Sequence, residues 1–220
     1  MQSTVPLTLL HEAPSDPESL GSEIATFLQQ FRDPMINGNC PYIHMRAISF
    51  HSDQDRANWI GYMPDPLTRD LFSNFGGSDP KYKKNTQIGL FSTPTGQLVG
   101  NQWQDRGWHV YVVAIVRDAI PDRKGKRILI WDCDPVPTAS ETTRWRSVLW
   151  GRQRTFVDYL RKHRAMSKAE IWYNTDDSYS GRNQCLMLSL QKVAQWASLG
   201  DIGYLGSEDP RFQNCVKLKP

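Results

Sequence analysis

The sequence has few of the features that mark secreted or membrane proteins. Its four cysteines, Cys40, Cys133, Cys185 and Cys215, lie far apart and include no C-x-x-C pair, which argues against the dense disulfide framework of small secreted domains. No basic segment followed by an apolar core opens the chain, and no run approaches the ~20 apolar residues of a membrane span. We therefore expect reduced thiols, no membrane partner, and a location in the cytoplasm or nucleus.

The chain also lacks an internal repeat, a long linker and a strong charge. A net charge of +3 over 220 residues is far from that of a dedicated nucleic-acid-binding protein, and 39% apolar residues are enough to build a core. The sequence predicts a single domain over residues 1–220, with residues 1–17 as a loose, proline-containing lead-in.

Hydrophobic periodicity predicts an α+β order of elements. Helical spacing is found in the segments 18–31, 66–74, 138–163 and 182–197, and the third of these opens on a Thr138-to-Glu141 capping box. Strands are predicted at 42–50, 109–116, 127–131 and 169–173. The turn residues between 116 and 127 predict that the second and third strands pair as a hairpin.

Cys185 is the first residue that suggests chemistry, because the predicted helix places it in a first turn. The unpaired N–H groups and the dipole of a helix start stabilise a thiolate and can face an oxyanion. The alternative is that Cys185 is a small buried apolar residue beside Leu186 and Leu188.

His109 opens one predicted strand and Asp132 follows the next. If the two strands form a hairpin, both side chains emerge at one end of it, where a carboxylate can hold an imidazole in a required tautomer. Taken singly, each residue has a structural alternative: a histidine at a strand end or an aspartate in a turn.

The combination resembles the Ulp/sentrin-type SUMO-deconjugating cysteine peptidases and, more distantly, the adenovirus proteinase. The matching segments are Trp108-His109-Val110-Tyr111, Leu129-Ile130-Trp131-Asp132 and Asn183-Gln184-Cys185-Leu186. The resemblance implies a papain-like, Ulp-type fold with a central, mostly antiparallel sheet flanked by helices, and a thiol protease that needs no cofactor or metal.

The resemblance also implies roles for individual residues. His109 takes the proton of Cys185, Asp132 orients His109, and the thiolate attacks a peptide or isopeptide carbonyl, in this family after the Gly-Gly end of a ubiquitin-like protein. Gln184, Asn183 and Asn174 are the oxyanion-hole candidates, because the stretch where the family has its glutamine contains none here. The substrate-binding candidates are Trp108 and Trp59.

Three other interpretations stay open at this level. In the first, the chain is a catalytically inactive relative that binds a protein partner. In the second, it is a nucleic-acid-binding protein that uses the basic stretches 123–127 and 161–164. The third is a metal site, for which Cys40 with His44, or Cys133 with Asp134, supply only one ligand pair each.

Overall fold

A computed structural model describes the part of the chain that carries the predicted hairpin and the Cys185 helix. The described residues are 41–46, 84–99, 102–119, 125–135, 139–149, 157, 161, 166–176 and 185–220. The predicted lead-in 1–17 and the predicted helices 18–31 and 66–74 lie outside these residues. The described helices include none that is both long and apolar enough to cross a membrane.

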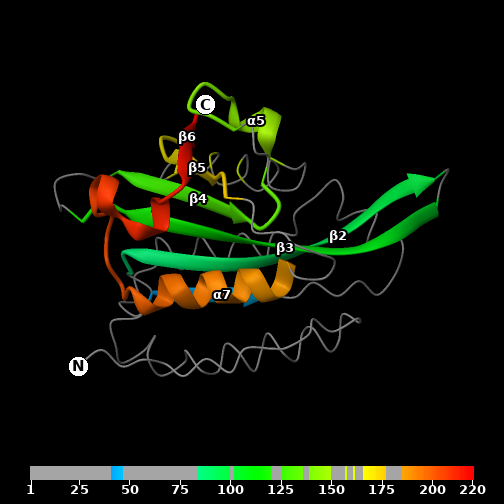
Figure 1. The fold of residues 1–220 in the computed structure, drawn as a ribbon, viewed down its shortest axis with the longest axis horizontal. Helices are drawn as coiled ribbons and strands as arrows, with labels where there is room; N and C mark the ends of the chain where they lie inside the picture. The colour runs from blue at the N-terminus through cyan, green and yellow to red at the C-terminus, as the bar shows by residue number, and fades with distance from the viewer. Residues whose placement is uncertain are drawn as a thin grey trace.

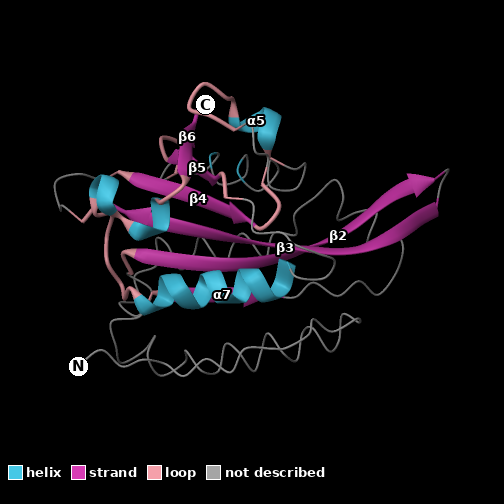
Figure 2. Cartoon of the chain, viewed as in Figure 1, coloured by secondary structure: helices cyan, strands magenta, loops and turns pink. Residues whose placement is uncertain are grey.

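The described residues form one six-stranded sheet whose strands lie side by side in chain order (Figure 1). Its strands are β1 (Tyr42–Arg46), β2 (Thr86–Val99), β3 (Gln102–Arg117), β4 (Lys126–Asp132), β5 (Glu170–Asn174) and β6 (Cys215–Leu218). Pairing is antiparallel for β2–β3, β3–β4 and β5–β6, and parallel for β1–β2 and β4–β5. The helices among the described residues are α5 (Trp145–Val148) and α7 (Cys185–Ser198), with 3₁₀ turns η2 (Gly206–Glu208) and η3 (Pro210–Phe212). The predicted α+β class is confirmed at this level (Figure 2).

The predicted hairpin is confirmed as the antiparallel pair β3–β4, in which Val113 faces Ile130. β3 is longer than predicted because its first half pairs with β2 alone. The β3–β4 ladder begins at Tyr111 opposite Asp132, whereas the β2–β3 ladder extends back to Gln102. The outer part of β2–β3 therefore leaves the body as a two-stranded ribbon (Figure 1).

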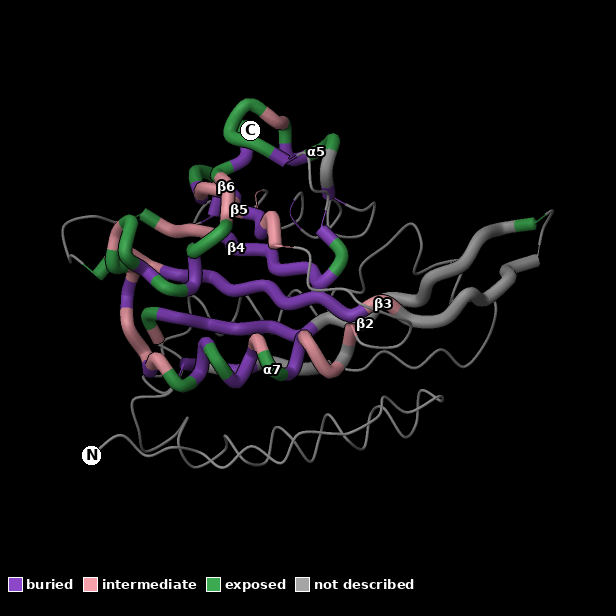
Figure 3. Tube along the Cα trace, viewed as in Figure 1, coloured by how far each residue is buried: buried purple, intermediate pink, exposed green. Residues whose placement is uncertain are grey.

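Alternation along β3 divides the core into two layers. Val110, Val112 and Ala114 face a cluster that α7 covers with Leu190 and Val193. Their neighbours Tyr111, Val113 and Ile115 face a second cluster, which contains Trp145, Leu149 and Val157 from the β4–β5 connection. Both faces of the central strands are thus buried (Figure 3), as the continuous apolar run in β3 requires.

The helix predicted over 138–163 does not begin where the capping box placed it. Residues 141–143 form a turn and bend, and α5 starts only at Trp145, after Arg144, which provides no side-chain cap. The segment instead pairs with the C-terminal end of the chain: Trp145 N donates to Lys219 O, and Lys219 N donates to Thr143 O. These backbone bonds outweigh the local helix signal. The predicted inward positions of Trp145 and Leu149 are confirmed.

Candidate active site

His109 and Asp132 form a partly buried hydrogen-bonded pair. His109 Nε2 lies 2.9 Å from each carboxylate oxygen of Asp132, whose side chain is fully buried, while 19% of the His109 side chain is exposed. The register explains the contact. Because Tyr111 faces Asp132 across β3–β4, His109 is two residues further along the same face and is the diagonal neighbour of Asp132.

The charges around His109 favour its protonated form. Burial by itself lowers the pKa of this imidazole, but the Asp132 hydrogen bond and the negative charges of Asp132 and Asp134 outweigh burial, so the pKa is raised. The Tyr111 ring stacks on the imidazole with centroids 6.5 Å apart. An imidazolium held in this way is suited to stabilise a neighbouring anion, such as a thiolate.

The Asp132 carboxylate is oriented by the turn that follows it as well as by His109. The backbone N–H of Asp134 donates to Asp132 Oδ1 at 3.0 Å. Asp134 itself is exposed. Sequence reasoning did not identify this contact, although an aspartate that accepts from the N–H two residues later is a common way to end a strand.

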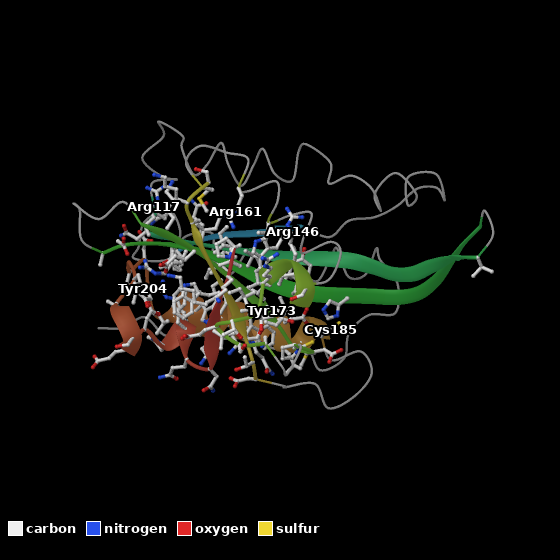
Figure 4. The ribbon with its side chains drawn as sticks, turned by 90° about the horizontal axis from the view of Figure 1, so that it is seen from above. Arg117, Arg146, Arg161, Tyr173, Cys185 and Tyr204 are labelled. Atoms are coloured by element: carbon white, nitrogen blue, oxygen red, sulfur yellow. The ribbon has the colours of Figure 1, made fainter. Side chains whose placement is uncertain are left out.

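Cys185 is the first described residue of α7, so the helix predicted over 182–197 is confirmed from this residue onward, and its side chain is half-buried. One turn later, Ser189 Oγ donates to the carbonyl of Val110 at 3.2 Å, and Val110 directly follows His109. Four residues of helix span about 6 Å, so the first described turn of α7 lies near the middle of β3, where His109 is. Figure 4 shows Cys185 at the side from which the β2–β3 ribbon leaves, far from Arg117 and Tyr204.

Cys185 also lies close to the residue that follows Asp132. Its side chain packs on the cluster that contains Cys133, and negative charge on Cys185 is one of the influences that raise the pKa of Cys133, after burial and the charge of Asp132. The start of α7, the end of β4 and the middle of β3 therefore meet at one end of the sheet.

The three described cysteines, Cys133, Cys185 and Cys215, form no disulfide bonds with one another, and they differ in exposure. Cys133 is completely buried. Burial also raises the pKa of Cys215 to about 12. Cys40 lies outside the described residues. Two of the three described thiols are therefore poor nucleophiles, because only the thiolate reacts.

Asn174 does not serve as an oxyanion donor. Its Nδ2 donates to the carbonyl of Asp132 at 2.7 Å and to that of Asp176 at 3.1 Å, which uses both amide hydrogens. Asn174 is also 1% exposed. The predicted oxyanion role is wrong for this residue, and its carboxamide holds the Asp132 backbone instead.

Several other predicted site residues fall where the structure gives no side chain. Asn183, Gln184 and Trp59 lie outside the described residues. Trp108 lies in β3 opposite Pro94, but only its backbone is described. Among the described residues no group of three or more histidine, cysteine or acidic side chains is arranged to hold a metal ion.

Comparisons of this chain with protein-family models, with curated proteins and with solved structures found no match.

Proposed function

We propose that this chain is a thiol-dependent peptidase or isopeptidase in which Cys185 is the nucleophile, His109 the base and Asp132 the residue that orients the base. The observation that carries the proposal is the partly buried His109–Asp132 pair, with both carboxylate oxygens 2.9 Å from Nε2. A carboxylate that accepts from one imidazole nitrogen keeps the proton on that nitrogen and leaves the other nitrogen able to accept a proton. This is the role of the acid in a catalytic triad.

The proposed mechanism requires Cys185 Sγ to come within reach of the His109 imidazole. His109 and Asp132 are on the face of the sheet opposite α7, so the thiol must approach the imidazole around the end of β4. β4 ends at Asp132, opposite Tyr111, and its ladder does not extend to His109. His109 Nδ1 is then the nitrogen that takes the thiol proton, because Nε2 is bound to Asp132.

The chemistry follows from these roles. His109 Nδ1 accepts the Sγ proton, the thiolate attacks the substrate carbonyl, and the imidazolium returns the proton to the leaving amine. A thioester to Cys185 remains, and water hydrolyses it with His109 again acting as base. The proposed substrate is a protein joined through the Gly-Gly end of a ubiquitin-like modifier, and this choice comes from the family resemblance alone.

The described contacts do not favour the nucleic-acid alternative. Arg127, at the end of one basic stretch, binds Asp118 and Glu170 and lies 3.6 Å from the centre of the Tyr204 ring. Arg161, at the start of the other, donates to the carbonyl of Ser167 at 3.4 Å. Both side chains make contacts within the protein, whereas a backbone-tracking surface presents its cations to phosphates.

The proposal predicts covalent capture by a ubiquitin-like protein with a thiol-reactive electrophile at its C-terminus. We expect the full chain to form an adduct with at least one probe from a panel that includes ubiquitin and SUMO, with the mass increase on Cys185. Cys185→Ala should form none, whereas Cys215→Ala should react like the wild type, because burial keeps the Cys215 thiol protonated. A folded wild-type chain that forms no adduct with any probe would favour the inactive relative instead.

A further inference from the structure

Asn174 makes an unusual set of contacts with Asp132. Its Oδ1 accepts from the backbone N–H of Asp132 at 2.7 Å, and its Nδ2 donates to the backbone carbonyl of the same residue at 2.7 Å. A third bond, from Nδ2 to the carbonyl of Asp176 at 3.1 Å, fixes the other amide hydrogen. The carboxamide therefore binds both polar groups of one residue's backbone and has no hydrogen left to donate elsewhere.

The place of Asn174 in the sheet explains this arrangement. The parallel β4–β5 ladder runs from Arg127 opposite Glu170 to Ile130 opposite Tyr173. Beyond that pair, the Asn174 side chain supplies the donor and the acceptor that a neighbouring strand would offer. A carboxamide has the same two groups as a peptide unit, so it holds β4 in place for two residues past the last backbone pair.

The backbone of Asp132 is consequently fixed by Asn174. Asn174 binds both backbone polar groups of Asp132 from the β5 side, and on the other side Asp132 lies opposite Tyr111 in the β3–β4 ladder. Only two side-chain torsions then separate the fixed backbone from the carboxylate, and the contacts with His109 and with the Asp134 N–H define them. Small displacements of this backbone would change the 2.9 Å contacts with His109 directly.

We propose that Asn174 is a positioning residue, which aims the Asp132 carboxylate at His109 by clamping the Asp132 backbone. The effect on the histidine–aspartate pair is independent of any activity, whereas its importance for catalysis rests on the proposed peptidase function. Asn174 touches neither the imidazole nor the thiol in this account, so its influence passes through Asp132.

The test is to measure the pKa of His109 in the full chain for wild type, Asn174→Ala and Asn174→Ser. NMR of isotope-labelled histidine monitors the pH titration. Because the contact with Asp132 raises the pKa of His109, we expect this pKa to fall in both variants. Thr175→Val is the matched control: it removes a neighbouring side-chain hydrogen bond, from Thr175 Oγ1 to the carbonyl of Asn214, that does not involve Asp132. It should leave the His109 titration unchanged.

Reaction with the ubiquitin-like probe is the second readout, and we expect the two Asn174 variants to react about 10- to 100-fold more slowly than wild type. If a folded Asn174 variant has the same His109 pKa as the wild type, the inference is overturned, even if the wild type reacts with the probe. If the pKa of His109 falls in the Asn174 variants but the wild type never reacts with the probe, the inference is supported and the proposed function is not.

A measurement on the wild type covers the case in which neither variant folds. Both Asn174 carboxamide protons are donated inside the protein, so they should exchange slowly with solvent. Rapid exchange would also overturn the proposal.

Discussion

Replacing His109 by glutamine is expected to slow reaction with the ubiquitin-like probe by about 10²–10⁴-fold, the usual contribution of a positioned base. Glutamine can still donate to Asp132 from its terminal amide, which keeps a partner for this fully buried carboxylate. It has no group that takes a proton from the Cys185 thiol at neutral pH. The variant therefore separates the chemical role of His109 from its structural one.

His109→Ala is the harsher comparison, because it leaves the buried Asp132 carboxylate without its imidazole partner. We expect both variants to lose the reaction but only the alanine variant to lose marked thermal stability. A glutamine variant that reacts as fast as the wild type would contradict the assignment of His109 as the base.

Replacing Asp132 by asparagine is expected to lower the rate by up to about 10⁴-fold, the effect of this change in a Ser-His-Asp triad. The Asp134 N–H already donates to Asp132 Oδ1. An asparagine oxygen would take that bond and turn its NH₂ group toward His109 Nε2. The imidazole proton would then move to Nδ1, and this nitrogen could no longer accept from Cys185.

The matched control for this change is Asp134→Asn. It removes a negative charge that raises the pKa of His109, but it keeps the backbone N–H that binds Asp132. We expect this variant to retain most of the activity and to show a modest downward shift of the His109 pKa. Equal losses in the two variants would mean that net charge, and not the Asp132 hydrogen bond, is what matters.

The predictions from sequence succeeded where one physical signal dominated. The apolar, β-branched run after His109 forms a strand buried on both faces, and the hairpin pairing predicted from the sequence after it is confirmed as β3–β4. The described residues from Cys185 onward form a helix, as the apolar spacing over 182–197 predicted. These elements bring His109 and Asp132 together, and that contact follows from local patterns and strand alternation.

The predictions failed where pairing partners distant in the sequence decide the structure. β2 was not predicted, because Gly89, Pro94 and Gly96 interrupt its strand pattern. Pro94 lies beyond Phe91, where the β1–β2 ladder ends, so it occupies the part of β2 that pairs with β3 alone. The capping box at Thr138 was overridden by backbone bonds to Lys219.

The role of Asn174 illustrates the same limit within the site. An asparagine at a strand end is commonly a turn residue, and nothing in its neighbourhood indicates which backbone groups it meets. Its partner Asp132 is 42 positions away in the chain, so the clamp becomes visible only when β4 and β5 are paired.

The most direct test of the central claim is the pH dependence of iodoacetamide labelling at each thiol, measured by mass spectrometry between about pH 5.5 and 8.5. If Cys185 and His109 form a thiolate–imidazolium pair, Cys185 should label at least about tenfold faster than Cys133 and Cys215 at neutral pH, and His109→Gln should remove most of this advantage. Cys133 and Cys215 serve as internal controls, because burial raises the pKa of each. If Cys185 labels no faster than these two, or if its rate and pH profile are the same in His109→Gln, then Cys185 and His109 do not act together and the peptidase account is wrong.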